Sequence, residues 1–333
     1  MSKILLTPLK LLYSIATELR NCLYDKKILK STGLEIPVIS VGNITAGGTG
    51  KTPFAIALAN MLVNREFRPA IITRGYKRKS NGQVIVSKGG GPMVNATESG
   101  DEPYLMAKKT AGVVIIANAD RVVAGRTAHQ QFGCDIIIAD DCFQHRQLAR
   151  DVNILLWDAY SSPVEEKLLP VGRLRESFKH LNRADILVLT RTNNPEQNYI
   201  DFFHHFGLEC YYSPTKITGI SAQNREIDPK FLRNKKFLAF CGLGNHQQFF
   251  DTVKTLQPSA MITAKFPDHH KYSDTEMDKI FARSIGENCD FIITTEKDKT
   301  NIPENYLNHK NLLILSIELK INQALCDRIL SLI

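Results

Sequence analysis

The chain has 333 residues, 43% of them hydrophobic and 23% charged, which is typical of a soluble globular protein long enough for two domains. Its 42 Lys and Arg residues outnumber its 34 Asp and Glu residues, and the net charge of +8 attracts phosphates of any kind without choosing among them. Seven cysteines without a C-x-x-C pair or a Cys/His cluster argue against a zinc site and a disulfide framework, and indicate a reducing, cytoplasmic-side location.

An amphipathic helix is predicted at the N-terminus. Thr7 and Pro8 supply an N-cap and a proline at the first helical position. Apolar residues then recur at spacings of three and four, at Leu9, Leu12, Ala16, Leu19 and Leu23. The run is too short to cross a bilayer, which takes about 20 residues, and it lacks the cleavage site of a secretory signal. With its basic flanks the helix suits a membrane interface, and packing on its own domain is the alternative.

A glycine-rich loop joins a predicted strand at 36–41 to a predicted helix at 52–64. The loop reads Thr45-Ala46-Gly47-Gly48-Thr49-Gly50-Lys51-Thr52. Backbone N–H groups of such a loop wrap a polyphosphate at the positive end of a helix. Lys51 then reaches the β- and γ-phosphates of ATP, and the Thr52 hydroxyl takes Mg²⁺. The strict pattern has glycine at position 45, but the strand–turn–helix context favours a nucleoside triphosphate site over an idle turn.

The rest of the first half alternates between strands and helices. Strands are predicted at 69–73, 84–86, 113–117, 136–139, 152–157 and 186–190, and helices at 102–110 and 120–132. Short apolar runs separated by helices predict an α/β fold, a P-loop NTPase-like, mostly parallel sheet with helices on both faces. The polar segment 193–230 is interpreted as the connection between domains.

A second, smaller α/β domain is predicted near the C-terminus. Its strands are expected at 237–240, 260–265, 291–294 and 312–315, and its helices at 246–256, 274–286 and 321–332. A dinucleotide-binding turn at Gly242 and Gly244 is disfavoured because Gln247 occupies the third glycine position. The expected domains are an N-terminal helix (1–30), a nucleotide-binding domain (31–200), a linker with β-strands (201–235) and a second domain closing over the cleft (236–333).

Several charged residues are candidates for chemistry. Asp140 and Asp141 end an apolar strand, where a P-loop fold places its Mg²⁺-organising acid, although a plain turn would read the same. Asp101 opens a predicted helix and is either an N-cap or a carboxylate that prepares an attacking hydroxyl. His269 is either a general base or a structural histidine, since its sequence neighbours supply no certain partner.

Basic residues form further candidates. Arg173 and Arg175 would stabilise charge on a transferring phosphoryl group, and Glu176 would join the metal site. Arg121 and the cluster at 74–79 would hold an acceptor phosphate. A solvated surface is the alternative for all of these side chains.

These motifs, in this order, resemble the tetraacyldisaccharide 4'-kinase family, the lipid A 4'-kinases of Gram-negative bacteria. The matching pieces are residues 42–53, 74–76, 100–103, 140–145, 170–176, 266–269 and 294–298, so the resemblance covers nearly the whole chain. It implies transfer of the γ-phosphate of ATP, with Mg²⁺, to the 4'-hydroxyl of a tetraacylated glucosamine disaccharide 1-phosphate, giving lipid IVA. It also implies that Asp101 and His269 act together on that hydroxyl.

The expected site combines this resemblance with the residue chemistry. The catalytic residues are expected to be Lys51, Asp101, Arg175 and His269. The metal residues are expected to be Thr52, Asp140, Asp141 and Glu176. The acceptor is expected to contact Arg74, Tyr76, Arg78 and Arg121.

The expected partners are the lipid substrate and the cytoplasmic face of the inner membrane, which the N-terminal helix would meet in a peripheral or monotopic manner. No obligate protein partner is inferred. A nucleic-acid role is disfavoured because the basic clusters lack interleaved aromatics.

One departure and two rival functions accompany the resemblance. The family usually has glycine where this chain has Cys142, and a Cβ there restricts a positive φ. Thr45 matches the usual Ser or Thr of the family. A membrane-associated P-loop ATPase of the partitioning or regulatory kind carries a second lysine where this chain has Ala46. A non-catalytic nucleotide-gated binding module would leave the charged residues around the loop without a purpose.

Overall fold

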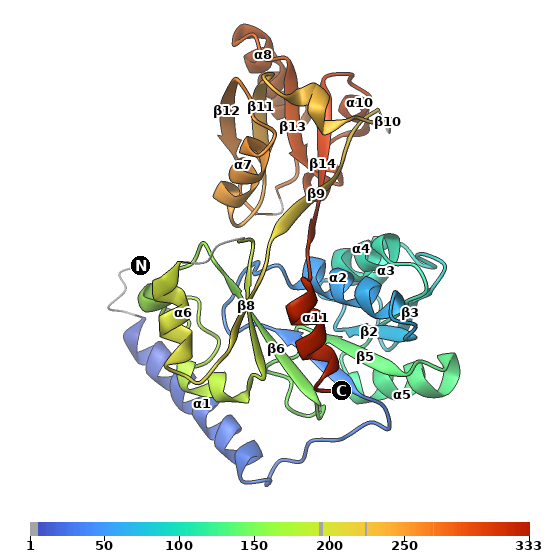
Figure 1. Ribbon diagram of the computed structural model, residues 1–333, viewed down its shortest axis with the longest axis vertical. Coiled ribbons are helices and arrows are strands. Elements are labelled where there is room, and N and C mark those ends of the chain that lie inside the picture. Colours follow the sequence, from blue (N-terminus) through green and yellow to red (C-terminus); the bar gives the residue numbers. More distant parts are fainter. Residues whose placement is uncertain (1–5, 193–195, 224, 269) are drawn as a thin grey trace. The chain divides into compact units, whose positions relative to one another are not determined.

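The computed structural model describes residues 6–192, 196–223, 225–268 and 270–333, and it divides into two compact units (Figure 1). The first unit comprises Met1–Pro214 and Leu319–Ile333, and the second comprises Thr215–Glu318. The chain therefore crosses between the units twice. This division differs from the expected boundaries, since the second unit begins before residue 236 and the last helix belongs to the first unit.

The first unit is built on an eight-stranded sheet in the order β3-β4-β2-β5-β1-β6-β7-β8. Every neighbouring pair is parallel except β3 and β4, which confirms the prediction of a mostly parallel sheet. The strands are β1 (Val38–Gly42), β2 (Pro69–Thr73), β3 (Val84–Lys88), β4 (Val114–Ala117), β5 (Ile136–Asp140), β6 (Val152–Asp158), β7 (Ile186–Thr190) and β8 (Cys210–Ser213).

Helices cover both faces of this sheet because successive strand residues point to opposite sides. In β1, Ile39 and Val41 pack in one core cluster with Phe54 of α2, whereas Val38 packs in another with Val122 of α5. The helices of the unit are α1 (Thr7–Asp25), α2 (Lys51–Val63), α3 (Ala96–Ser99), α4 (Asp101–Lys109), α5 (Arg121–Phe132), α6 (Gln197–His204) and α11 (Gln323–Leu330), with the 3-10 helices η1 (Pro163–Glu165) and η2 (Phe178–Arg183).

The C-terminal helix α11 returns to the first unit and packs on the same face as α2 (Figure 1). Leu325 and Ile329 join the core cluster of that face, and the Cys326 thiol lies 3.5 Å from the Met61 sulfur. Helix α11 therefore packs against α2, with the contact between Cys326 and Met61 spanning 265 positions of the chain. The periodicity of the segment predicts its helix but does not say which unit it packs on.

The segment 193–230 is not a connection throughout. It contains α6 and β8, which belong to the first unit, and then the first strands of the second unit. Strand β8 lies at the edge of its sheet and is only partly buried, so its residues lack the continuous apolar run that marks the central strands. Its edge position explains why this strand is hard to recognise in the sequence.

The second unit holds a six-stranded sheet in the order β10-β9-β14-β13-β11-β12. Its strands are β9 (Thr215–Ala222), β10 (Arg225–Glu226), β11 (Lys236–Cys241), β12 (Ala260–Lys265), β13 (Phe291–Thr295) and β14 (Leu312–Leu319). Its helices are η3 (Pro229–Leu232), α7 (His246–Lys254), α8 (Asp274–Gly286), α9 (Glu296–Lys299) and α10 (Glu304–Leu307). Strands β11 to β14 pair in parallel, as expected for an α/β unit.

Gly42 at the end of β1 gives a test of this packing. A Cβ on Gly42 would lie 2.6 Å from the Phe143 Cβ and 2.7 Å from the Phe143 backbone nitrogen. We expect Gly42→Ala to lower the free energy of unfolding by about 1–3 kcal/mol, because overpacking displaces buried neighbours. Urea unfolding measures the change, with Gly33→Ala as the control, since a Cβ on Gly33 meets nothing within 4 Å. Equal midpoints for the two variants would contradict the packing described here.

Candidate active site

The carboxyl ends of β1 and β5 bring the glycine-rich loop and the two aspartates together. These strands are adjacent and parallel, with Val41 of β1 in register with Asp140 of β5. Ligands of open α/β sheets bind at this edge of the strands. The strand pattern and the short loops therefore suffice to place Asp140 and Asp141 beside the phosphate-loop sequence.

The phosphate loop turns on two glycines with positive φ. Gly47 has φ 115° and Gly50 has φ 85°, a region that side chains with a Cβ rarely adopt. Helix α2 begins directly after them at Lys51. The N–H groups of a first helical turn have no partner within the helix, so the start of α2 offers donors and a positive dipole end to an anion.

Asn43 organises the interior of the loop, a role that sequence reasoning did not assign. Its side-chain amide donates to the Thr49 hydroxyl at 2.9 Å and to the Thr45 hydroxyl at 3.4 Å. The side-chain oxygen of Asn43 accepts from the Lys51 Nζ at 3.3 Å. Asn43 lies within the motif that the sequence singles out, but only the fold shows that its side chain turns back into the loop.

Asp141 joins the phosphate loop to the segment 173–176. One carboxylate oxygen lies 3.5 Å from the Lys51 Nζ, and the Arg175 guanidinium donates to both oxygens at 2.9 and 3.1 Å. Burial acts to raise the pKa of Asp141, but the charges and hydrogen bonds of Lys51 and Arg175 outweigh it and lower the pKa below its ordinary value. Asp141 is therefore an ionised carboxylate held between two cations.

Asp140 has the opposite electrostatic character. The side chain is 2% exposed, and one oxygen accepts from the Thr73 hydroxyl at 3.0 Å. The other oxygen is buried and has no hydrogen-bond partner in the described part of the chain. Burial, followed by the nearby charges of Glu102 and Asp141, raises the pKa of Asp140 to about 7.

The unpartnered oxygen of Asp140 fits a metal ion. Mg²⁺ takes carboxylate and hydroxyl oxygens as ligands, and a cation there would satisfy an acceptor that is otherwise costly to bury. Thr52 stands at the second position of α2 and is buried. Asp140, Asp141 and Thr52 therefore form a donor set whose chemistry suits Mg²⁺ beside a bound triphosphate.

The segment 173–176 fastens the phosphate loop from the other side. The Ala46 N–H donates to the Arg173 carbonyl at 2.6 Å, and the Arg175 N–H donates to the Ile44 carbonyl at 2.7 Å. These bonds form a short antiparallel bridge between the loop and the segment. The position of the Arg175 guanidinium is thus tied to the backbone of the loop itself.

Glu176 supports this segment, and the metal role expected for it stays a prediction. The side chain is fully buried, and one oxygen accepts from the Gln144 amide at 2.9 Å. The other accepts from the Asn21 amide at 3.1 Å and the Arg183 guanidinium at 2.5 Å. Gln144 also donates to the Asn43 carbonyl at 2.8 Å. Because both carboxylate oxygens are taken by protein donors, we place Glu176 in the scaffold around the loop.

The residues expected to contact the acceptor differ in exposure. Arg74 and Tyr76 are exposed, Tyr76 to 68%. Arg78 donates to the Ala117 carbonyl at 2.9 Å and to a second backbone carbonyl, so its guanidinium braces a turn. Arg121 is 3% exposed, and burial lowers its pKa while the carboxylates at the end of β5 act to raise it. Only Arg74 and Tyr76 present their side chains to solvent as an acceptor contact would require.

Asp101 is exposed at the start of α4. The N-cap position belongs to Gly100, whose φ is 93°, so the N-cap interpretation of Asp101 is wrong. A Cβ on Gly100 would lie 2.9 Å from the Tyr76 carbonyl oxygen, which ties the start of α4 to the Arg74–Tyr76 turn. His269 lies outside the described residues.

A buried aspartate organises three loops of the second unit. Asp298 is 1% exposed and accepts from the Gly242 N–H at 2.8 Å, the Tyr272 hydroxyl at 2.8 Å and the Thr295 hydroxyl at 2.6 Å. These donors come from the loops after β11 and β12 and from the last residue of β13. A Cβ on Gly242 would lie 2.9 Å from the Pro267 carbonyl oxygen, so this glycine serves close packing of loops.

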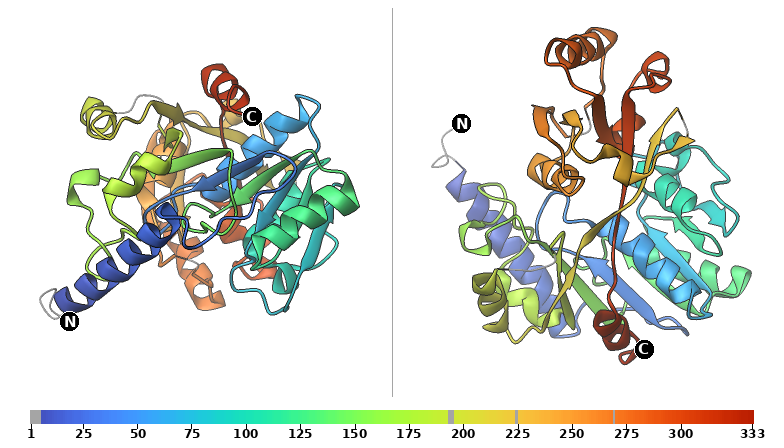
Figure 2. Two further views of the ribbon diagram at one scale, coloured as in Figure 1. Left: turned by 90° about the horizontal axis from the view of Figure 1, so that it is seen from below. Right: turned by 45° about the horizontal axis from the view of Figure 1, so that its top comes forward.

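Helix α1 packs with its polar side toward the protein. Tyr13 and Asn21 face inward, where the Tyr13 hydroxyl donates to the Arg175 carbonyl at 2.7 Å. The apolar side points outward, with large exposed side chains at Leu9, Leu11, Leu12, Ile15 and Leu19. Helix α1 therefore packs on its own unit, but through its polar side, and its apolar side stays exposed. Figure 2 shows α1 in dark blue along the outside of its unit.

No helix in the described ranges combines the length and the apolar content that crossing a membrane requires.

Cys142 is fully buried behind the site. The positive φ in this turn falls on Asp141, at 47°. The Cβ of Cys142 is thus accommodated without strain at its own position, and the left-handed residue is an aspartate, a type that tolerates this region.

The raised pKa of Asp140 predicts a pH dependence of stability. Its folded pKa of about 7 exceeds the unfolded value, so the native state keeps a proton that the unfolded chain releases above about pH 4. This contribution to stability falls as pH rises from about 4 to 7. Asp140→Asn is expected to raise the thermal midpoint over wild type more at pH 8 than at pH 5, without nucleotide or metal. A difference that is constant with pH would contradict the assignment.

Comparisons with known proteins match the whole chain. A family model described as tetraacyldisaccharide-1-P 4'-kinase (LpxK) matches residues 2–333. A tetraacyldisaccharide 4'-kinase of Aquifex aeolicus (strain VF5) is 38% identical over 319 residues, covering 96% of this chain and 94% of the relative. One of Syntrophus aciditrophicus (strain SB) is 36% identical over 314 residues, covering 90% and 84%.

The fold agrees with these relatives. A crystal structure of the "apo" form of LpxK from Aquifex aeolicus in complex with ATP superposes with a TM-score of 0.76 at 36% identity, covering 100% of this chain and 99% of that chain. These matches confirm the resemblance of the sequence motifs and the P-loop kinase fold. The chain belongs to the tetraacyldisaccharide-1-P 4'-kinase family.

Proposed function

We propose that the protein transfers the γ-phosphoryl group of ATP to the 4'-hydroxyl of a tetraacylated glucosamine disaccharide 1-phosphate, a step of lipid A biosynthesis. One observation carries this proposal. A phosphate loop, an ionised aspartate and a buried aspartate with an unpartnered oxygen meet at one edge of a parallel sheet, in a chain that matches a kinase family over its whole length. The solved relative with ATP supports the choice of nucleotide.

The residues around the loop have different roles in binding ATP and Mg²⁺ and in stabilising the transferring group. The backbone of residues 45–52 and the Lys51 ammonium bind and orient the triphosphate. Thr52, Asp140 and Asp141 would hold Mg²⁺, which when bound neutralises charge on the phosphate oxygens. Arg175 lies against Asp141 and supplies a positive charge where the transferring group gains negative charge.

The acceptor hydroxyl is prepared by Asp101 and His269 in this proposal. Asp101 is exposed beside the turn that carries the acceptor candidates Arg74 and Tyr76, so its carboxylate is accessible to a sugar hydroxyl. A carboxylate within hydrogen-bond reach orients the hydroxyl and takes its proton. The support for His269 is its place in the matching motif at 266–269. Arg121 and Arg78 then add positive charge near Arg74.

We also propose that α1 seats the protein on the cytoplasmic face of the inner membrane. Five large apolar side chains of one helix face are exposed, including Leu11 at 63% and Leu12 at 64%. An outward apolar face with a basic flank lies favourably in the interface of an anionic bilayer. This location brings the nucleotide site to a substrate whose acyl chains are held in the membrane.

The function is tested by incubating the purified chain with Mg·ATP and detergent-dispersed disaccharide 1-phosphate. We expect the lipid product to gain the mass of one phosphate while ADP accumulates in equal amount. Lys51→Ala is expected to reduce kcat about 10²-fold or more, because a charge aimed at the transferring phosphate is removed. Release of free phosphate without a phosphorylated lipid would contradict the proposal and favour the regulatory ATPase.

The same assay separates the acceptor residues from the nucleotide residues. Asp101→Ala and His269→Ala are expected to lower kcat about 10²-fold or more while ATP binding stays near wild type, since proton transfer is their role. Full kcat in both variants would remove them from the mechanism.

The membrane proposal is tested by flotation with vesicles of anionic phospholipid. Leu12→Ser with Ile15→Ser is expected to weaken vesicle binding about tenfold or more, because each exposed apolar side chain buried in the interface contributes about 1 kcal/mol or more. Val164→Ser with Ile285→Ser is the control, since it removes two exposed apolar side chains elsewhere. Equal binding of both double variants would show that α1 is not the membrane contact.

A further inference from the structure

The attachment of α1 to its unit is almost wholly polar. None of the hydrophobic core clusters among the described residues includes a residue of α1. The inward face instead carries hydrogen bonds and ion pairs, such as those of Glu18 with Lys179 and His180. Most surface helices are held by an apolar stripe, so a helix with the reverse pattern is positioned by its polar partners.

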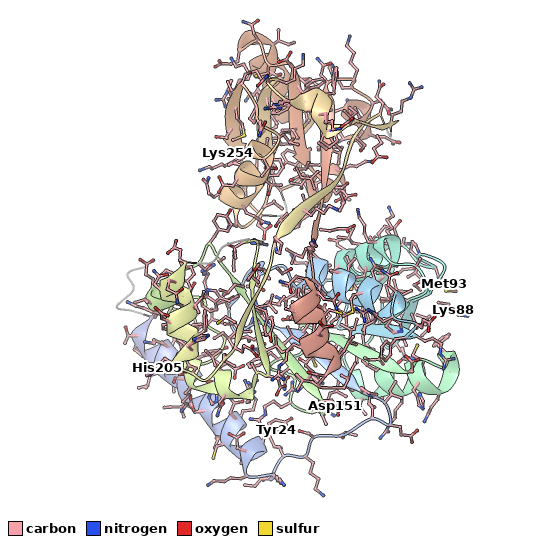
Figure 3. All side chains as sticks on the ribbon, in the orientation of Figure 1. Tyr24, Lys88, Met93, Asp151, His205 and Lys254 are labelled. Atoms are coloured by element: carbon pink, nitrogen blue, oxygen red, sulfur yellow. The ribbon has the colours of Figure 1, made fainter. Side chains whose placement is uncertain are left out.

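Asn21 is the most deeply placed of these polar residues. Its side chain is fully buried, and its amide donates to the Glu176 carboxylate at 3.1 Å across 155 residues of sequence. Its backbone carbonyl accepts from Arg146 at 3.1 Å. The Arg146 guanidinium also lies over the ring of Tyr24, which Figure 3 labels near the end of α1. The inward face is therefore held at Asn21 from both its side chain and its backbone.

Glu176, the partner of Asn21, is connected to the phosphate loop through Gln144 and Asn43. Glu176 accepts from Gln144, and Gln144 donates to the Asn43 carbonyl. Asn43 in turn contacts Lys51 at 3.3 Å. Four contacts thus run from the buried face of α1 to Lys51, three between side chains and one from the Gln144 side chain to the Asn43 backbone carbonyl.

A second contact of α1 reaches the same segment independently. The Tyr13 hydroxyl donates to the carbonyl of Arg175, whose N–H is bonded to the Ile44 carbonyl within the phosphate loop. Tyr13 and Asn21 lie eight residues apart, about two helical turns, and therefore on one side of the helix. Helix α1 is consequently clamped to consecutive residues, 175 and 176, at two points.

We propose that Asn21 is a positioning residue of the kinase site. By holding the buried Glu176 carboxylate it fixes the segment 173–176, which in turn fixes the phosphate loop and the Arg175 guanidinium. Helix α1 is then part of the active-site scaffold as well as an anchor. The effect on phosphoryl transfer rests on the proposed function, whereas the effect on ATP binding does not.

The physical reason lies in the charge of Glu176. A fully buried carboxylate is stabilised by its donors, here Asn21, Gln144 and Arg183. Removing the Asn21 amide leaves one carboxylate oxygen with one hydrogen bond fewer. The carboxylate then moves toward its remaining donors, Gln144 and Arg183. Gln144 is shared with the phosphate loop, so the loop is the structure that shifts.

The test is ATP binding to the full chain without any lipid acceptor or vesicle. Asn21→Ala is expected to raise the Kd for Mg·ATP about threefold to thirtyfold, the range of coupling carried by a contact network. Cys22→Ser, the next residue on the exposed side of α1, is the matched control and is expected to leave the Kd at the wild-type value. Vesicle binding of both variants is expected to equal that of wild type, since the apolar face is intact.

A double variant that exchanges the amide of Asn21 and the carboxylate of Glu176 separates positioning from simple loss of stability. Asn21→Asp alone puts a second carboxylate against Glu176 and is expected to raise the Kd more than Asn21→Ala. Combining Asn21→Asp with Glu176→Gln restores one amide, one carboxylate and one buried negative charge beside Arg183. This double variant is expected to recover at least half of the lost binding free energy and kcat.

The outcomes are distinct. An ATP Kd that stays at the wild-type value in folded Asn21→Ala would overturn the proposal, as would a double variant no better than Asn21→Asp. A change confined to vesicle binding would also overturn it. The Kd of Asn21→Ala could be raised while the wild-type chain phosphorylates no lipid. That result would leave Asn21 as a positioning residue and reject the proposed function.

Discussion

The Asp141 carboxylate between Lys51 and Arg175 is the interaction on which the site depends. A half-buried anion is stabilised by cationic partners, and these two come from the phosphate loop and from the segment 173–176. Satisfying one charge therefore brings three separate stretches of chain to the carboxyl edge of the sheet. The same arrangement lowers the pKa of Asp141, whereas burial raises the pKa of its neighbour Asp140 to about 7. The two adjacent carboxylates thus have pKa values shifted in opposite directions.

The reversed amphipathic pattern of α1 connects this site to an exposed apolar surface. Its apolar residues face outward and its polar residues reach Arg175 and Glu176, so one helix serves two surfaces with different chemistry. An ordinary surface helix would bury the apolar face and contribute core packing. If α1 has the proposed membrane role, membrane seating and site geometry share a structural element. A lipid kinase benefits from such sharing because its acceptor is confined to the bilayer surface.

Much of the fold could be predicted from the sequence. Continuous apolar runs mark the buried parallel strands, and the glycine spacing before Lys51 predicts the phosphate loop. The β-strands expected in the linker are present, but its division between the two units and the return of α11 to the first unit depend on contacts between residues far apart in sequence. Local patterns do not encode such pairings.

The sequence predicts which residues lie at the site better than it predicts which contacts they make. Strand ends place Lys51, Asp140 and Asp141 correctly at one edge. The hydrogen bonds of Glu176 could not be predicted, because two of its donors lie 32 and 155 residues away and are visible only in the fold. Asn43 and Gln144 stood inside recognised motifs, but an amide carries no sign of which atoms it will bond.

The most direct measurement is a crystal structure of the protein with Mg²⁺ and a non-hydrolysable ATP analogue. The account predicts phosphates along the backbone of residues 45–52, a metal ion against the unpartnered oxygen of Asp140, and Glu176 still bonded to Asn21 and Gln144. A nucleotide bound elsewhere, or a metal ion coordinated by Glu176 after its release from Asn21, would contradict it.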